Sequence, residues 1–271
     1  MIINQGNQTA FLRTIRMALN EAPSVTRPKN MFPHLFSSSD TADTLKKISS
    51  RTTGELNELV EILRVNGDSL NISTHIVESF DKAAAVVVEL VRTKEPEFNH
   101  TKHVIMHDHP DIAALQLWKR FNREAVTLHT AFSRDLHTKD KTIASFIGIT
   151  APNIGVADSA TLVQLTESGR PRSTSLLPSI HIAILKRENL VANLAEAYAL
   201  LQEESRLDSF VFISGPSKTA DIEAHMVQGA HGPREVHLIV LSEPLPQKEL
   251  RETLEDTEEP VSLSEVPEER I

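Results

Sequence analysis

The chain has 271 residues, 40% hydrophobic and 24% charged, which is enough apolar material for a sizeable globular core. Of its formal charge of −9, residues 243–271 contribute −7, and no lysine- or arginine-rich stripe is present, which argues against nucleic-acid binding. Cysteine is absent, and this excludes disulfides, thiolate nucleophiles, thiolate zinc sites and iron–sulfur clusters held by this chain.

Residues 1–53 are predicted to hold one helix and a linker. From Thr9 to Ala22 apolar residues recur at helical spacing, and the prolines and serines that follow favour an irregular connection over residues 21–53. The first residues lack a basic region followed by an apolar core, and no apolar run approaches about 18 residues. We therefore expect a cytoplasmic protein without a membrane span.

Residues 54–242 are predicted to form one α/β domain with an open sheet. Helices and strands are expected to alternate, because short β-branched runs are separated by amphipathic segments, which is typical of parallel strands joined by crossover helices. In the first half, helices are predicted around residues 56–64, 81–92, 112–121 and 139–147, and strands around residues 70–77, 102–106 and 126–130.

Beyond Gly148 the predicted elements are mostly short strands. They cover residues 153–156, 161–165, 181–185, 210–214 and 236–241, with helices at 189–203 and 220–228. Six of the nine glycines lie from Gly148 to Gly232, so this window is predicted to contain the site, where the backbone approaches a ligand closely. Residues 243–271, rich in proline and glutamate, are predicted to be a disordered acidic tail.

One candidate site follows the strand at residues 210–214, where a Gly-Pro turn leads into a predicted helix. Amide groups at a helix N-terminus beside the carboxyl end of a strand commonly bind ligands. The candidate ligand contacts are Ser214, Gly215, Ser217, Thr219, Asp221 and Glu223. The two acidic residues would repel a phosphate and favour a hydroxyl-bearing, cationic or protein ligand. Ordinary capping by Ser217 or Thr219 is the alternative.

A second candidate comprises Asp158, Ser159 and Thr161, between two strand-like runs. Asp158 is suited to accept a proton or a hydrogen bond from a substrate hydroxyl, although Asp and Ser are also ordinary turn residues. A third comprises Arg170 and Arg172, in a loop that leads to His181. Arginine matches carboxylates bidentately, so this loop is predicted to hold a small organic acid.

For the arginines of that loop the alternative is a solvated basic loop, and for His181 it is a hydrogen-bonded core histidine. His100, His103, His107 and His109 straddle a predicted strand and its loop, which is not the spacing of metal ligands on a helix, so no metal is expected. His231, followed by glycine, is a candidate ligand contact. The sequence contains no phosphate-binding loop, dinucleotide-binding glycine motif or nucleophile elbow.

Five blocks of sequence together resemble the lactate utilization protein C family, the LUD-domain proteins. They are Gly155–Val163, Gly169–Arg172, Leu177–His181, Ile213–Glu223 and Gly229–Pro233. The resemblance implies a fold like that of sugar-phosphate isomerases, coenzyme A transferases and formyltetrahydrofolate cyclo-ligases. It also implies a role in oxidising L-lactate to pyruvate beside two cysteine-rich iron–sulfur proteins. Ala160 departs from the family, which commonly has glycine there.

The resulting prediction is a subunit or accessory protein of an iron–sulfur-dependent L-lactate oxidation system, not catalytic alone and with no redox cofactor on this chain. In our site hypothesis, Arg170 or Arg172 holds a carboxylate while Asp158, Ser217 and His231 line the same pocket. The alternatives are a free-standing enzyme acting on a small anionic substrate and a histidine-rich metal binder.

Overall fold

The structure is a computed structural model, which describes residues 13–15, 17, 41–97, 101–122, 124–132, 137–203, 209–220, 226–229 and 231–242. The chain divides into two compact units, Met1–Asp43 and Thr44–Ile271. Of the helix predicted over residues 9–22, residues 13–15 and 17 are helical, and the remainder lies outside the described residues, as does the predicted tail. Within the described part of the chain, no helix is long and apolar enough to cross a membrane.

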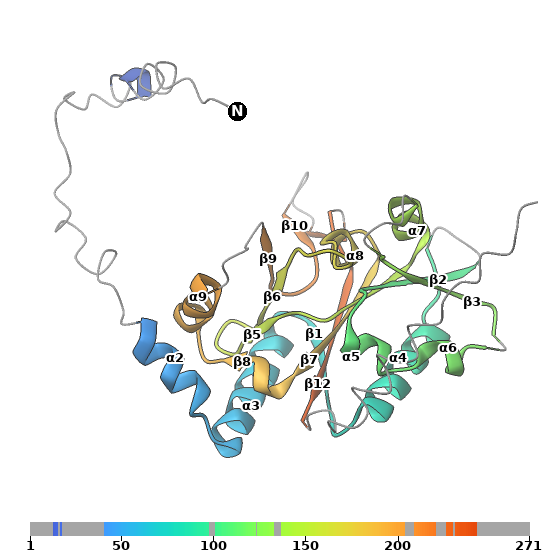
Figure 1. Cartoon of the computed structure of the whole chain (residues 1–271). Helices are drawn as coiled ribbons and strands as arrows, with labels where there is room; N and C mark the ends of the chain where they lie inside the picture. Colours follow the sequence, from blue (N-terminus) through green and yellow to red (C-terminus); the bar gives the residue numbers. More distant parts are fainter. Residues whose placement is uncertain are drawn as a thin grey trace, which may run out of the picture. The chain divides into compact units, whose positions relative to one another are not determined.

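The second unit is built on a six-stranded sheet in which all neighbouring strands are parallel (Figure 1). The strand order is β1-β12-β7-β4-β2-β3. The strands are β1 (Ile72–Val77), β2 (Lys102–Met106), β3 (Val126–Thr130), β4 (Ile147–Thr150), β7 (Ile180–Lys186) and β12 (Glu235–Leu241). The prediction of an α/β fold with an open parallel sheet is confirmed.

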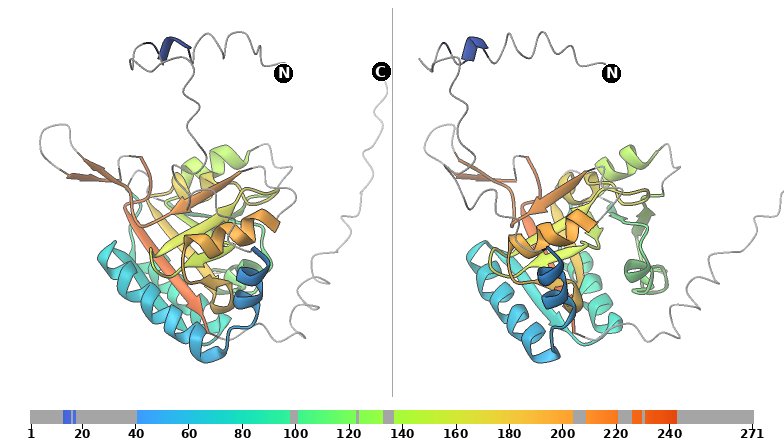
Figure 2. Two further views of the ribbon diagram at one scale, coloured as in Figure 1. Left: turned by 90° about the vertical axis from the view of Figure 1, so that its left-hand side faces the viewer. Right: turned by 60° about the vertical axis from the view of Figure 1, so that its left-hand side comes forward.

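A second, smaller sheet has the order β8-β5-β6-β9. It consists of β8 (Leu190–Val191), β5 (Ile154–Val156), β6 (Thr161–Leu165) and β9 (Phe210–Ile213). The β5–β6 and β6–β9 pairs are antiparallel. Strands β10 (Lys218–Ala220) and β11 (Met226–Gln228) form a separate antiparallel pair, which extends away from the two sheets (Figure 2).

Helices begin where polar side chains satisfy the first free amides. Thr52 and Glu55 form a reciprocal capping box at the start of α3, and Ser79 caps α4. The described helices are α2 (Thr41–Ser49), α3 (Thr53–Ser69), α4 (Phe80–Thr93), α5 (Pro110–Ala113), α6 (Leu117–Arg120), α7 (Thr138–Ala144), α8 (Ser173–Leu176), the 3₁₀ turn η3 (Arg187–Asn189) and α9 (Leu194–Glu203).

The elements of the second unit pack in layers, with an apolar core between each pair (Figure 1). Helices α4, α5 and α6 cover one face of the parallel sheet, where Val87 and Ile112 share a core with Ile182. Helix α3 and the second sheet cover the opposite face, through Leu63 and Leu162. Helix α9 packs on the outer face of the second sheet. Strand β6 therefore presents alternate residues to two different cores.

Helix α2 lies within the segment that we predicted to be a linker. The turn between α2 and α3 is fixed by Arg51, whose Nη2 donates to both carboxylate oxygens of Glu196 at 2.7 and 2.5 Å. Glu196 also accepts a hydrogen bond from the amide of Ala192 at 2.7 Å. This anchor was invisible in the sequence because the partners are 145 residues apart.

Three helix predictions were wrong in extent or in kind. The helix predicted at 112–121 is split into α5 and α6, because Gln116 adopts a left-handed φ of 48°. The predicted start of α9 is instead η3 and β8. At the described ends of the helix predicted over residues 220–228, Lys218–Ala220 and Met226–Gln228 are instead the paired strands β10 and β11, because cross-strand pairing overrides the helix-like spacing of apolar residues. Strands β4 and β8 and helix α8 were missed.

Candidate functional site

The order of the parallel sheet reverses direction between β2 and β4. The chain runs outward from β2 to β3, whereas β4, β7 and β12 follow one another in the opposite direction. In open α/β sheets, ligands bind beyond the carboxyl ends of the strands at such a switch point. Here the amide of His107, just after β2, donates to the carbonyl of Ile149 in β4 at 3.0 Å. This is the candidate functional site.

A tight loop after β6 reaches this edge of the sheet. The amide of Asp108 donates to the carbonyl of Gly169 at 3.0 Å. Gly169 has a φ of +77°, and a Cβ there would lie 2.9 Å from the Cβ of Asp108, so glycine is required for the close approach. Arg170 follows, and its Nη1 donates to Glu167 at 2.7 Å. The loop thereby brings a guanidinium to the carboxyl end of β2.

Charged side chains and histidines gather at this edge in a set that we call the carboxyl-edge cluster: His107, His109, Asp111, Arg170 and Lys186. Lys186, at the end of β7, lies 2.7 Å from Asp111. The Nδ1 atom of His109 accepts a hydrogen bond from the amide of Asp111 at 3.1 Å, which caps α5. The side chains of His109 and Lys186 are 18% and 21% exposed, so solvent or a ligand reaches them.

Both histidines of the cluster are neutral near pH 7. Burial lowers the pKa of His107 to about 3. Burial, helped by Arg170, lowers the pKa of His109 to about 4. The hydrogen bonds assign the tautomers: His109 accepts at Nδ1, so its proton is on Nε2, and His107 faces the Pro171 carbonyl through Nε2 at 3.3 Å. His109 is thus a neutral hydrogen-bond donor, and the Nδ1 atom of His107 is an acceptor.

Deeper in the molecule, His107 also belongs to a second group, which we call the inner polar layer: His107, Thr150, Gln164, Thr174 and His181. All five are buried. Thr150 and His181, on neighbouring strands, are joined by a 2.8 Å hydrogen bond between Oγ1 and Nε2. Burial lowers the pKa of His181 to about 4, so this ring is also neutral.

Helix α8 and strand β6 close over this layer. Gly148 pairs with His181 across the β4–β7 ladder, and a Cβ on Gly148 would lie 1.8 Å from the carbonyl oxygen of Thr174, so α8 rests directly on β4. Gln164 follows Leu162 by two residues on β6, and therefore faces the parallel sheet as Leu162 does.

The inner polar layer has more hydrogen-bonding groups than partners. Within the described part of the chain, no partner is present for Nδ1 of His107 and His181, Oγ1 of Thr174, or either amide atom of Gln164. A buried polar group left unpaired costs about 1–3 kcal/mol. Polar atoms of bound water or of a ligand would complete the hydrogen bonds of these groups.

The structure places only part of the predicted site here. Arg170 belongs to the carboxyl-edge cluster, and His181 is a wholly buried member of the inner polar layer. Arg172 is exposed and precedes α8, where its carbonyl accepts a hydrogen bond from Ser175 at 2.9 Å. Of the two arginines, Arg170 is the one positioned at the sheet.

Another set of predicted residues lies at the opposite end of β6. Thr161 and Ser214 share a 2.7 Å hydrogen bond between their hydroxyls, and Gly215 follows. Asp158 and Ser159 form the β5–β6 turn, which Asn66 holds by donating to the carbonyls of residues 157 and 158 at 3.0 Å. We call these five predicted residues the turn-end group: Asp158, Ser159, Thr161, Ser214 and Gly215. The Oγ of Ser159 is buried and has no partner among the described residues.

The remaining predicted residues belong to the base of the β10–β11 pair or lie outside the described residues. The amide of Ser217 donates to the carbonyl of Pro233 at 2.8 Å, and the carbonyl of Ser217 accepts from Gly229 at 2.9 Å. His231 is exposed, and Thr219 belongs to β10. Asp221 and Glu223 lie outside the described residues. Because Lys218–Ala220 form a strand, the predicted start of a helix, with its free amides, is not present at these residues.

The structure does not bring Arg170 into one pocket with Asp158, Ser217 and His231. Strand β6 lies between the two sets, and from Thr161 to Leu165 an extended chain spans about 13 Å. Sequence reasoning missed Asp111, Lys186, Gln164 and Thr174 as site residues and considered His107 and His109 only as metal ligands. The sequence did contain one usable indication of the site, because His107 and His109 come just after β2, a strand whose bounds were predicted correctly.

Metal binding by the first histidine group gains no support from its geometry. His103 stacks on His129, with ring centroids 5.2 Å apart, and His100 lies outside the described residues. Across the residues that the structure describes, no three histidine, aspartate or glutamate side chains gather in a way that could hold a metal ion.

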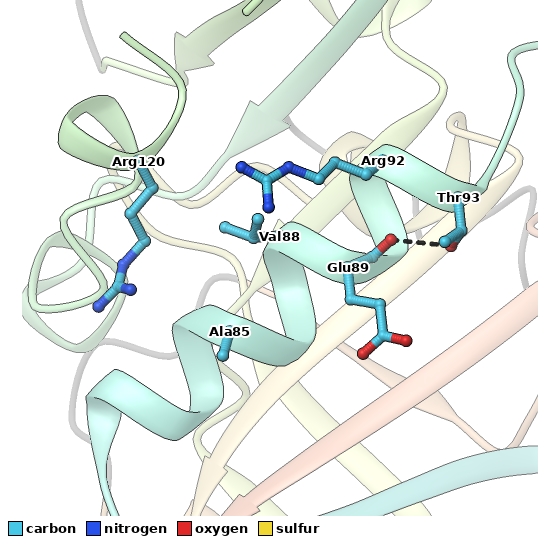
Figure 3. A pocket seen from close by; sticks show the side chains of 6 residues that line it. All are labelled: Ala85, Val88, Glu89, Arg92, Thr93 and Arg120. Atoms are coloured by element: carbon cyan, nitrogen blue, oxygen red, sulfur yellow. Dashed lines mark hydrogen bonds between the residues drawn. The ribbon is translucent and has the colours of Figure 1, made fainter. Parts of the chain in front are cut away.

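A groove of about 470 Å³ runs along the outer side of α4 (Figure 3). It is lined by Ala85, Val88, Glu89, Arg92, Thr93 and Arg120. Its two arginines already form ion pairs, Arg92 with Glu124 and Arg120 with Asp81. Among the described residues, none of the side chains that line this groove has a buried polar atom without a partner, whereas the carboxyl-edge cluster adjoins several such atoms, so the cluster remains the stronger candidate.

The family model of the LUD domain matches residues 60–241. A protein of Exiguobacterium named Lactate utilization protein C is 29% identical over 240 residues, covering 87% of this chain and 96% of that protein.

Further relatives match over shorter stretches. The Lactate utilization protein C of Shouchella clausii is 42% identical over 101 residues, covering 36% of this chain and 44% of its own length. That of Halalkalibacterium halodurans is 36% identical over 149 residues, covering 52% of this chain and 64% of its own length. In both cases the match spans less than two thirds of the relative. Among solved structures, a DUF162 family protein from Deinococcus radiodurans matches with a TM-score of 0.46 and 16% identity, covering 70% of this chain and 99% of that one.

Proposed function

Because the chain belongs to the LUD domain family, we propose that it is a subunit or accessory protein of an iron–sulfur-dependent system that oxidises L-lactate to pyruvate. The observation that carries the proposal is the match, over 87% of the chain, to a relative named Lactate utilization protein C. The proposal includes a cytoplasmic location, cysteine-rich partner proteins and no redox cofactor on this chain. The complete absence of cysteine supports the assignment of the clusters to partners.

The carboxyl-edge cluster gives this role a chemical basis. Oxidation of lactate removes two electrons and two protons from the carbon–hydroxyl unit; the electrons would pass to the clusters of the partners and the protons to solvent. This chain would hold the acid: Arg170 and Lys186 are suited to its carboxylate, and the Nε2–H of His109 is a neutral donor to a nearby oxygen. A neutral donor stabilises an oxygen without adding a proton to it.

The proposal is tested by reconstitution. Lactate-dependent dye reduction is measured with the candidate iron–sulfur proteins, with and without this chain. We expect activity only when all components are present. Full activity without this chain would refute a necessary role as a subunit.

A matched pair of variants tests the site in the same assay. Arg170→Ala removes an arginine that is paired with Glu167, three residues away. Arg64→Ala removes one that is paired with Glu61 at the same spacing, on α3. We expect Arg170→Ala to reduce the activity at least tenfold and Arg64→Ala to leave it unchanged. Equal activity of the two variants would contradict the assigned role of Arg170.

The position of the cluster at the switch point also favours a second candidate, a free-standing enzyme acting on a small anionic substrate. The two functions differ in one measurable respect. A free-standing enzyme turns over lactate or another small acid without partner proteins, whereas a subunit or accessory protein is inert until they are added.

A further inference from the structure

The strongest unexplained feature of the molecule is the set of unpaired polar atoms in the inner polar layer. Gln164 is 1% exposed, and both its amide nitrogen and its amide oxygen have no partner among the described residues. Thr174 and His181 are each 0% exposed, and each also has one polar atom unpaired within that part of the chain. Such groups persist in a folded protein when something else completes their hydrogen bonds.

The residues of the inner polar layer come from separate elements that face the same side of the parallel sheet. Thr150 and His181 are hydrogen-bonded across β4 and β7. Thr174 lies over Gly148, the ladder partner of His181. His107 is held against β4 by its amide and against the loop before α8 by its ring. A group entering beside His107 would therefore meet polar atoms from several directions.

The side chains of the inner polar layer are uncharged and include both hydrogen-bond donors and hydrogen-bond acceptors. The amide nitrogen of Gln164 and the hydroxyl of Thr174 donate, while the amide oxygen of Gln164 and Nδ1 of His107 accept. None of the five side chains is an acid, a lysine or an arginine, so a carboxylate would find no counter-charge inside. The cations, Arg170 and Lys186, are in the carboxyl-edge cluster, which shares His107 with the layer.

We propose that the inner polar layer binds the oxygen on the second carbon of a small 2-hydroxy or 2-oxo monocarboxylate, while the carboxyl-edge cluster holds the carboxylate of the same molecule. A hydroxyl both donates and accepts, and a keto oxygen accepts, so both redox states of the acid find partners. This inference rests on the proposed function for the identity of the acid. It adds a residue set, Gln164, Thr174 and His107, that discriminates such acids from simple carboxylates.

The test uses calorimetric titration of the full chain with L-lactate, pyruvate and propionate, which lacks the oxygen on the second carbon. Thr174→Val and Gln164→Leu remove the unpaired polar atoms with little change of shape. The matched control is Thr74→Val, because the Oγ1 of Thr74 is also buried without a partner among the described residues but lies on β1.

We expect Thr174→Val and Gln164→Leu each to weaken the binding of lactate or pyruvate at least tenfold, and Thr74→Val to change it less than twofold. Propionate should bind more weakly to the wild type and should lose little affinity in the variants. The melting temperature of the ligand-free Thr174→Val protein should be unchanged or higher, because the variant removes a buried hydroxyl that lacks a partner. A change in binding then does not arise from loss of the fold.

Three results would overturn the inference. They are unchanged affinities in Thr174→Val and Gln164→Leu, equal binding of propionate and lactate, or no binding of any of the acids to folded wild type up to about 10 mM. The first result, combined with loss of binding in Arg170→Ala, would leave the proposed function intact and place the second oxygen elsewhere. Conversely, binding that is weakened in Thr174→Val and Gln164→Leu, together with an inactive reconstituted system, would reject only the role in lactate oxidation and would leave the binding site in place.

Discussion

The two ends of β6 differ in what their polar side chains do. At the start of the strand, the turn-end group is largely occupied with the fold: Thr161 bonds to Ser214, and the β5–β6 turn is held by Asn66. Beyond its other end, the loop with Gly169 and Arg170 approaches neutral histidines and buried atoms that have no partner among the described residues. Motifs conspicuous in the sequence can therefore be structural turns, whereas several unpaired polar atoms beside cationic side chains mark the better candidate for a site.

The largest expected effect concerns pH. The pKa values of His107 and His181 are lowered by burial to about 3 and about 4, from an ordinary value of 6.5. The unfolded chain therefore binds protons below pH 6.5 that the folded chain does not, so stability is full above about pH 6.5 and falls as the pH is lowered towards 4. At pH 5 each of these two histidines should lower the free energy of unfolding by about 2 kcal/mol.

Urea denaturation at pH 7 and at pH 5 measures this loss. In His107→Gln the loss should be smaller by about 2 kcal/mol, because a titrating group has been removed. In His231→Gln, a change at the exposed base of the β10–β11 pair, the loss should equal that of the wild type. Similar losses in all three proteins would show that the histidines of the sheet are not the source.

The next effect concerns close packing beside the inner polar layer. Gly148→Ala places a methyl group 1.8 Å from a backbone oxygen in α8, whereas Gly155→Ala meets the tips of two leucine side chains at 2.4 and 2.8 Å. We expect the free energy of unfolding to fall by about 3 kcal/mol in the first variant and about 1 kcal/mol in the second, because side-chain tips can move. Equal losses in chemical denaturation would contradict the direct seating of α8 on β4.

A smaller difference in the free energy of unfolding is expected between two variants that each remove a threonine hydroxyl from a hydrogen bond. Thr150→Val leaves a nitrogen of the wholly buried His181 unpaired and should cost about 2 kcal/mol. Thr161→Val leaves the hydroxyl of Ser214, an exposed residue that can turn to water, and should cost about 0.5–1 kcal/mol. Thermal and urea unfolding of both variants measures the ranking, and a larger loss in Thr161→Val would reverse the comparison.

The smallest effect is expected at Ala160 in the β5–β6 turn. Its φ of 44° is left-handed, a conformation that glycine adopts more readily than alanine. Ala160→Gly relieves about 1 kcal/mol of backbone strain and loses a buried methyl worth about 0.8 kcal/mol. The free energy of unfolding should therefore change by less than about 1 kcal/mol, and a loss of about 2 kcal/mol in urea denaturation would show that the methyl is essential.

The sequence predicted the bounds of the strands better than it predicted which strands are paired. Strands β2 and β3 have the predicted bounds because β-branched and apolar runs report local extended structure. The pairing of β1 with β12 could not be inferred, since nothing local specifies which strands lie side by side. Because the switch point depends on strand order, the carboxyl-edge cluster could not be assembled from sequence, even though Arg170 was identified.

The wrong predictions at Ser217 and Gln116 have a related cause. Ser217 resembled a helix cap because its neighbours had helical spacing, but its carbonyl instead accepts a hydrogen bond from Gly229, at the base of a strand pair. Likewise, the break at Gln116 depends on a left-handed conformation that no glycine or asparagine announces. In both places tertiary contacts decide between local conformations of similar energy.

The pairing of β1 with β12 also bears on how the chain folds. Among the described strands of the parallel sheet, β1 pairs with β12 alone, so its partner is the last strand of that sheet to be synthesised. At roughly 5–20 residues per second, a ribosome takes on the order of ten seconds or more to make the chain between them. During that time β1 has no partner strand in the parallel sheet, and its unpaired edge is exposed to other nascent chains. The order of the strands therefore delays completion of the parallel sheet until the last strand, β12, has been made.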